Sequence, residues 1–175
     1  MLLRMQKLLS SVVTDVTVIA NPEEYASFRI TCVPDHWPGQ GPLGGIITAL
    51  LTSSAARNMP QWNLIIGCDM PFLTKEWLAH LAQLALASDA EALVPRSASG
   101  LEPLCACWRT RGVDQLQKVF DSGTRKITDA MQKLKMEIVD ESHWKRFDTA
   151  GRVFWNMNTP ADYEEARRII KAEHA

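Results

Sequence analysis

Hydrophobic and polar positions follow two periods along the chain, and each period predicts a kind of element. Apolar residues at i, i+3, i+4 and i+7 predict helices. They cover residues 2–9, 42–51, 74–84, 124–134 and 160–170. Short apolar or alternating runs predict strands. They cover residues 16–20, 29–33, 62–68, 92–95, 103–108, 137–139 and 153–155. Because strands and helices alternate, we expect an α/β domain whose mostly parallel sheet carries helices on both faces.

Three of these helices have recognisable starts. Pro42 stands where a first helical residue belongs, because its missing N–H costs nothing there. Thr74 can cap the next helix with its hydroxyl. Thr159 and Asp162 have the spacing of a capping box, with Pro160 at the first helical position. These residues predict helix starts near positions 42, 75 and 160.

The composition is that of an ordinary globular domain. The chain has 175 residues, 46% of them hydrophobic, and a formal net charge of −1. A near-neutral chain lacks the basic balance that attracts nucleic acid, so we expect no nucleic-acid partner. No apolar run reaches the roughly 18 residues that a membrane span needs, so we expect no membrane partner either.

The four cysteines, at positions 32, 68, 105 and 107, form neither a C-x-x-C motif nor a Cys/His zinc spacing. Cys105 and Cys107 are two residues apart, so a strand would place them on one face, as small apolar side chains. This cysteine usage predicts a reduced, cytoplasmic protein.

Polar side chains follow three of the predicted strands: the loop from Asp35 to Gly41, then Asp69, then Asn156 with Asn158. In doubly wound sheets, ligands bind beyond the carboxyl ends of the strands. Mg²⁺ usually takes one or two protein carboxylates, which Asp69 could supply, with an amide oxygen such as that of Asn158 completing the shell. Each residue also has a structural alternative as a turn former or helix cap.

Further charged side chains lie near predicted strand or helix ends: Glu102, Arg109, Arg111, Arg125 and Lys126. Arg125 and Lys126 open a predicted helix, and a helix start with cations could receive an anion. A solvated helix terminus is the alternative.

Five motifs occur in a fixed order along the chain. They are GPLGGI (41–46), GCDMPFL (67–73), GLEPLCACWRT (100–110), SGTRKITD (122–129) and FWNMNTPADYEEA (154–166). Their order and spacing resemble the MobA-like nucleotidyltransferases, the family that includes the molybdenum cofactor guanylyltransferases. The resemblance extends over essentially the whole chain.

The resemblance implies a three-layer Rossmann-like fold of the GT-A type found in nucleotide-diphospho-sugar transferases. It also implies a Mg²⁺-dependent transfer of GMP from GTP to molybdopterin, the molybdenum cofactor, with release of pyrophosphate. A cytidylyltransferase or another MobA-like NTP transferase is one alternative. Another is a non-catalytic protein that docks on molybdoenzymes or cofactor-carrying partners.

The resemblance also implies roles for individual residues. Asp69 corresponds to the catalytic Mg²⁺ ligand and Asn158 to a second ligand. The positions that correspond to nucleoside contacts are Asp35, Gly41, Pro42 and Leu43. Asn156 and Arg125 correspond to positions on the substrate side.

One hallmark of the family does not occur in this sequence. Members open with a strand and a loop of the form LAGG-x-S-x-R-M-G-x-D-K, whereas MLLRMQKLL at residues 1–9 matches the helix after that loop. We therefore expect a single MobA-like domain over residues 1–175, truncated at its N-terminus. Its first strand would be missing between the strands at 16–20 and 64–66, which would leave strand edges open. A misplaced start codon, a degenerate fragment and a swapped assembly are three explanations, and we favour the first.

Overall fold

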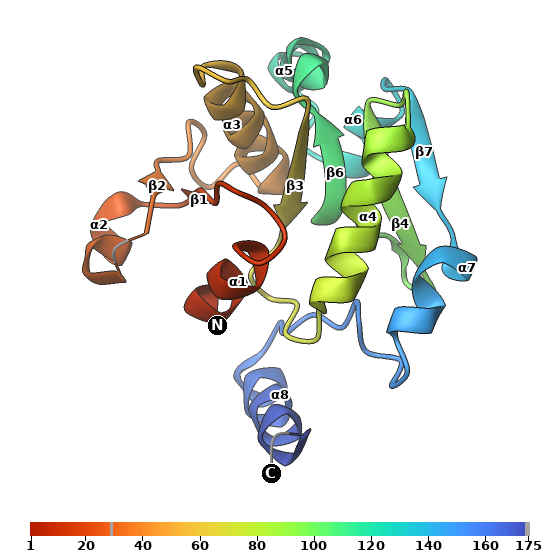
Figure 1. The fold of residues 1–175 in the computed structure, drawn as a ribbon. Helices are drawn as coiled ribbons and strands as arrows, with labels where there is room; N and C mark the ends of the chain where they lie inside the picture. Colours follow the sequence, from red (N-terminus) through yellow and green to blue (C-terminus); the bar gives the residue numbers. More distant parts are fainter. Residues whose placement is uncertain (29, 174–175) are drawn as a thin grey trace.

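The computed structural model describes residues 1–28 and 30–173, and its strands and helices alternate along most of the chain, apart from β4–β6 and α5–α6 (Figure 1). A pair of short parallel strands stands by itself: β1 (Val18–Ile19) and β2 (Cys32–Val33). The larger sheet has the order β3-β6-β4, with β7 on the other edge of β4. Its strands are β3 (Trp62–Ile66), β4 (Ala92–Ser97), β5 (Gly100–Leu101), β6 (Cys105–Arg109) and β7 (Met136–Val139). The predicted α/β class is confirmed.

The α-helices, in chain order, are α1 (Leu2–Leu9), α2 (Pro22–Tyr25), α3 (Pro42–Ser54), α4 (Lys75–Ala87), α5 (Val113–Asp121), α6 (Ile127–Met131), α7 (Glu141–Trp144) and α8 (Pro160–Glu173). Three short 3₁₀ turns accompany them in the described residues, at Ala26–Phe28, Thr110–Gly112 and Lys145–Phe147. The helix starts predicted at Pro42, Thr74 and Pro160 are confirmed, and the Thr74 hydroxyl accepts the Trp77 N–H at 3.2 Å.

The mostly parallel arrangement needs one correction. β3, β4 and β7 run in the same direction, but β6, predicted at residues 103–108, lies antiparallel between β3 and β4. The reason is local: β4 turns tightly into β5, which pairs with it antiparallel, and β6 follows three residues later. A connection this short returns the chain antiparallel, whereas a parallel return needs a crossover of a dozen or more residues.

Other boundaries differ from the predictions. The strand expected at 153–155 is not a strand: the Trp155 N–H closes a turn onto the Arg152 carbonyl, and Phe154 packs edge-on against Trp77 and Trp144. The helix expected from Thr124 covers only Ile127–Met131. The strand expected at 29–33 is observed at Cys32–Val33, and residue 29 lies outside the described residues. The sequence analysis did not predict α2, α5, α7 or β5.

β6 divides the core into two layers, as the period of two predicts. Cys105 and Cys107 point toward the face covered by α1 and α4, and Ala106 and Trp108 point toward α3, α5 and α6. All five residues of β6 are buried. The expected burial of Cys105 and Cys107 on one face is confirmed, and burial raises the pKa of both thiols. Helices thus cover both faces of the sheet (Figure 1).

β3 differs from this pattern because it lies at an edge. It pairs with β6 only, β1 pairs with β2 only, and no described strand pairs with their other edges. All five residues of β3 are half-buried, as its place at the edge of the sheet requires. An unpaired edge leaves N–H and C=O groups open to solvent. These are the two strands between which the sequence analysis expected an empty position.

Within residues 1–28 and 30–173, no helix combines the length and the apolar character that a membrane crossing requires.

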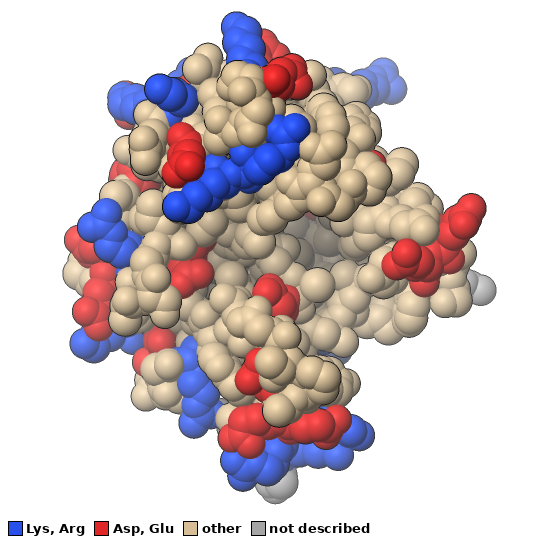
Figure 2. Space-filling model, turned by 180° about the vertical axis from the view of Figure 1, so that it is seen from behind, with Lys and Arg blue, Asp and Glu red and all other residues tan. Residues whose placement is uncertain are grey.

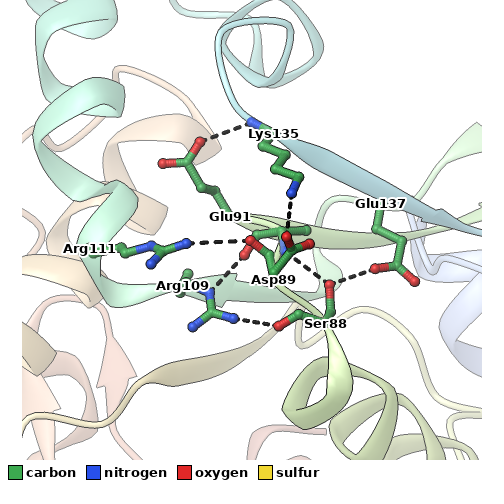
Figure 3. A network of polar contacts seen from close by, with 8 residues as sticks. Ser88, Asp89, Glu91, Arg109, Arg111, Lys135 and Glu137 are labelled. Atoms are coloured by element: carbon green, nitrogen blue, oxygen red, sulfur yellow. Dashed lines mark hydrogen bonds and ion pairs between the residues drawn. The ribbon is translucent and has the colours of Figure 1, made fainter.

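A polar network fixes the end of the sheet where β4 and β7 begin (Figure 3). Its centre is Arg109, which is 6% exposed. The guanidinium donates to the carbonyls of Ala90 (2.7 Å) and Ser88 (2.5 Å), and it lies 4.4 Å over the Trp62 ring. Lys135, at the start of β7, pairs with Asp89 in the same network (2.6 Å). Arg109 therefore joins the α4–β4 connection to β6, at the end opposite to Asp69.

We expect Arg109→Met to lower the free energy of unfolding by about 2–3 kcal/mol, because methionine can still pack on Trp62 but leaves two carbonyls without a donor. The matched control is Arg111→Met, since Arg111 is exposed and donates one 3.4 Å bond to the Asp89 carbonyl. That change should stay within about 0.5 kcal/mol. Urea unfolding followed by tryptophan fluorescence measures both, and equal losses would contradict the role assigned to Arg109.

Candidate functional site

The carboxylate of Asp69, three residues after the end of β3, lies directly over the backbone of Gly67. A Cβ at residue 67 would stand only 2.5 Å from Asp69 Oδ1 and 3.5 Å from the Cβ of Leu104. The Gly67 N–H also donates to the Leu104 carbonyl at 2.7 Å, which holds this turn against the segment before β6. Only glycine at residue 67 therefore lets the carboxylate take its position. β3 and β4 both point toward this end of the sheet (Figure 1).

The segment that carries Asn156 and Asn158 meets Asp69. The Met157 N–H donates to the Asp69 carbonyl at 2.8 Å, so the two asparagines flank a residue bonded to the Asp69 loop. The predicted capping box follows at once. Asp162 accepts the N–H groups of Asn158 (3.0 Å) and Thr159 (2.8 Å), and Thr159 Oγ1 accepts the Asp162 N–H (3.2 Å). Hydrogen bonds from Thr159 hold the pKa of Asp162 below its usual range. The start of α8 thus fixes the backbone of Asn158.

The oxygen donors at this end suit a hard divalent cation. Asp69 offers a carboxylate and Asn158 an amide oxygen, both on segments that the Met157 hydrogen bond joins. The described residues contain no group of three or more His, Cys, Asp or Glu side chains placed to hold a metal. A metal here would take its remaining ligands from water and substrate phosphates, as Mg²⁺ commonly does. The residues present therefore fit Mg²⁺ better than a soft metal such as zinc.

Asp35 shapes the loop after β2 with one of its two oxygens. Oδ1 accepts the Trp37 N–H and the Thr48 hydroxyl, each at 3.0 Å. Thr48, fully buried in α3, in turn accepts the His36 N–H at 3.1 Å. The turn role considered for Asp35 is therefore present. Among the described residues nothing donates to its Oδ2, which leaves that oxygen for a ligand.

The Gly41-Pro42-Leu43 turn forms the start of α3. Gly41 precedes the helix with a φ of +86°, in the region that favours glycine, and Pro42 is the first helical residue. The Leu43 side chain is fully buried in the core, so only its backbone can contact a ligand. A Cβ on Gly44 would stand 3.3 Å from the Trp37 Cβ and 3.8 Å from Asp35 Oδ1, so this glycine lets the loop approach the helix.

Arg125 is bound to the same loop. Its Nε donates to Gln40 Oε1 at 2.7 Å and its Nη1 to the Phe120 carbonyl at 2.6 Å. The guanidinium lies 3.8 Å over the Phe120 ring, whose centroid is 5.0 Å from that of Trp37. Arg125 therefore supports residues 37–40. The structure gives little support to the anion site considered at this helix start, because α6 has only five residues and Lys126 pairs with Asp129.

A pocket of about 690 Å³ opens beyond the end of β4. Six of the residues that line it are Ser97, Ser99, Glu102, Trp155, Asn156 and Asn158. Glu102 is only 7% exposed, and its Oε1 accepts the Ser97 hydroxyl at 2.6 Å. Burial, followed by the charge of Asp69, raises the pKa of Glu102, although the Ser97 hydrogen bond opposes the shift. Figure 2 shows the molecule from behind, where a separate hollow lies between the lobe that carries α2 and the rest of the molecule.

The structure thus brings the segments of Asp69, Asn156 and Asn158 together and places Asp35 on a second loop, which Arg125 contacts through Gln40. Arg109 and Arg111 lie at the opposite end of the sheet. The sequence analysis missed the supporting residues Gly67, Thr48 and Ser97. The glycine in GCDMPF was a usable signal for a close approach, whereas Thr48 and Ser97 act through contacts that no spacing reveals.

Comparisons with known proteins identify the family of the chain. Residues 1–137 match the MobA-like NTP transferase domain. A probable molybdenum cofactor guanylyltransferase of Clostridium perfringens (strain SM101) is 32% identical over 155 residues, which are 87% of this chain and 75% of the relative. One of Chloroflexus aggregans is 33% identical over 159 residues, covering 89% and 73%.

Among solved structures, the chain resembles the molybdopterin-guanine dinucleotide biosynthesis protein A of Archaeoglobus fulgidus, with a TM-score of 0.75 and 24% identity. The match covers 94% of this chain and 86% of that one, and it supports the fold. With the sequence match over residues 1–137, it leads to one conclusion: the chain belongs to the MobA-like NTP transferase family.

Proposed function

We propose that this chain transfers GMP from GTP to the terminal phosphate of molybdopterin, the molybdenum cofactor. The products are a guanine dinucleotide cofactor and pyrophosphate. Relatives at 32% and 33% identity carry the name of this activity, which supports the assignment. The structural observation that carries it is the carboxylate of Asp69, held over Gly67 and joined through Met157 to the two asparagines. We propose that residues 1–175 act as one domain in this reaction.

In this reaction a phosphate oxygen of molybdopterin bonds to the α-phosphorus of GTP. The bond from that phosphorus to the bridging oxygen breaks, and pyrophosphate leaves with the electron pair. The protein needs no covalent nucleophile for this, because alignment and neutralisation of charge lower the barrier. Asp69 and Asn158 would hold Mg²⁺, which supplies positive charge next to the phosphates. The Asp35 loop would receive the nucleoside through the free Oδ2 and the backbone at the start of α3.

The proposal also includes the cellular compartment of the protein and its partners. All four cysteines are free thiols, which suits a reducing compartment such as the cytoplasm. Molybdoenzymes or cofactor-carrying proteins would receive the dinucleotide cofactor after its release.

The direct test is Asp69→Asn, assayed by pyrophosphate release from GTP and molybdopterin with Mg²⁺. Loss of the carboxylate should lower kcat/KM about 100-fold or more, since charge neutralisation at the phosphates is typically worth several kcal/mol. Asp89→Asn is the matched control, because Asp89 is exposed and lies in the network at the other end of the sheet. No release by the unchanged chain, or full activity of Asp69→Asn, would refute the proposal. Release with CTP instead of GTP would assign the alternative base.

Gly67→Ala should show whether the position of the Asp69 carboxylate matters, because this change moves the carboxylate without removing it. The new methyl group would stand 2.5 Å from Asp69 Oδ1, so that side chain must rotate away while the backbone stays in place. We expect about a tenfold loss of kcat with little change in the melting temperature, because a misplaced catalytic group is costly even when folding is intact. Both are measured on the same preparation. A variant with unchanged kcat would show that the position over Gly67 is irrelevant.

Gly44 and Gly45, adjacent in α3, provide a variant and its control for testing whether the Asp35 loop binds the nucleoside. An added Cβ meets Trp37 at residue 44 but nothing within 4 Å at residue 45, and both sites gain similar helix propensity as alanine. We expect Gly44→Ala to raise the KM for GTP several-fold by displacing the loop, and Gly45→Ala to leave it unchanged. Initial rates at varied GTP measure both. Equal KM values would place the nucleoside away from the Asp35 loop.

A further inference from the structure

The pocket beyond β4 is lined by two hydrogen-bond acceptors without donors, and one of them is buried. Asn156 Oδ1 is buried and has no partner in the described structure. Glu102 accepts one hydroxyl at Oε1, and no described residue donates to its Oε2. A buried acceptor such as Asn156 Oδ1 costs free energy unless a ligand supplies an N–H or O–H group. Glu102, 7% exposed, offers a second acceptor in the same pocket. The pocket is therefore built for a group that presents several donors.

The charge of the pocket excludes a polyphosphate as its occupant. Four carboxylates line it, at Glu102, Glu141, Asp148 and Asp162, against the single cation Lys145. Lys145 is itself paired with Glu141 at 2.8 Å. Like charges in a partly buried site repel strongly, so a triphosphate would avoid this pocket. A neutral ring rich in N–H donors suits it better.

One wall of the pocket is aromatic. Trp155 lines it, and its ring stacks on Phe72 with centroids 5.3 Å apart and planes 18° apart. A ring held in this way offers a rigid surface for a flat heterocycle. Asn156 and Asn158, which line the same pocket, flank the residue bonded to Asp69. A ring bound here would thus lie next to the proposed site of phosphate transfer.

We propose that Glu102, with the amide oxygen of Asn156, recognises the adjacent N–H groups of a 2-amino-4-oxopteridine ring. This inference rests on the proposed function and names the residue that selects the acceptor substrate. A carboxylate can accept both N–H groups of such an edge at once. The Ser97 hydroxyl holds Glu102 in place, and the ring packs along Trp155. Guanine carries a similar edge, so the experiment must distinguish the acceptor ring from the base of GTP.

The test is a fluorescence titration of the chain with two small probes. Pterin carries the 2-amino group, and lumazine has an oxygen in its place. We expect the unchanged chain to bind pterin at least tenfold more tightly than lumazine, and Glu102→Gln to lose that preference. Glu141→Gln is the control, because Glu141 lines the same pocket but has a side chain that is 59% exposed and pairs with Lys145. It should keep the preference.

Ser97→Ala provides a second variant should Glu102→Gln fail to fold. It removes the 2.6 Å hydrogen bond to Glu102, together with local bonds to the Gly100 carbonyl and from the Ser99 N–H, and should reduce the preference in part. In the transfer assay, Glu102→Gln should raise the KM for molybdopterin about tenfold and leave the KM for GTP unchanged. A purely structural role would lower kcat or the melting temperature without this split.

Several outcomes would overturn the inference. They are no pterin binding at millimolar concentration, equal binding of the two probes, full preference in Glu102→Gln, and displacement of pterin by GTP without Mg²⁺. The last result would assign the pocket to guanine. Transfer of GMP without the pterin preference would refute this inference alone. The preference without any transfer would refute the proposed function alone, and Asp69→Asn should retain the preference.

Discussion

The contact between the Asp69 carboxylate and the Gly67 backbone is the constraint on which the candidate site depends. It places a negative charge where β3 ends, within a turn that the Gly67–Leu104 hydrogen bond fixes to the segment before β6. Because the Asp69 carbonyl also accepts the Met157 N–H, the same turn determines where the C-terminal asparagines lie. A shift of this one turn would separate the carboxylate, the amide oxygens and the pocket beyond β4.

The sheet can hold that turn because β6 is buried on both faces and ordered at both ends. Its alternating side chains join the two halves of the core, and Arg109 anchors its far end to the α4–β4 connection. β3, in contrast, is paired on one edge only and is half-buried throughout. The site therefore lies on a strand whose order comes mainly from one neighbour. Stability at the Arg109 end and chemistry at the Asp69 end are coupled through β6.

The sequence predicted those features whose causes are local. Helix starts at Pro42, Thr74 and Pro160 follow from capping and from the fixed φ of proline, and the structure has all three. α5 was missed although Val113, Leu116 and Phe120 have helical spacing, a signal that was available. The predicted strand at 153–155 was wrong because Phe154 packs against Trp77 and Trp144, and Trp155 stacks on Phe72, instead of the segment pairing in a ladder. Long-range contacts decided that segment.

The same limit applies to the site. Asp69 could be identified because it follows an apolar strand, but the role of Glu102 depends on its burial, on Ser97 and on a pocket built from two distant stretches, residues 97–102 and 141–162. That burial has a chemical consequence. The Asp69 carboxylate can bind a metal that contacts phosphates. The neighbouring pocket beyond β4 is acidic, so it repels phosphate and offers acceptors to N–H groups. Two neighbouring environments of opposite preference can orient a substrate that has a phosphate at one end and a donor-rich ring at the other.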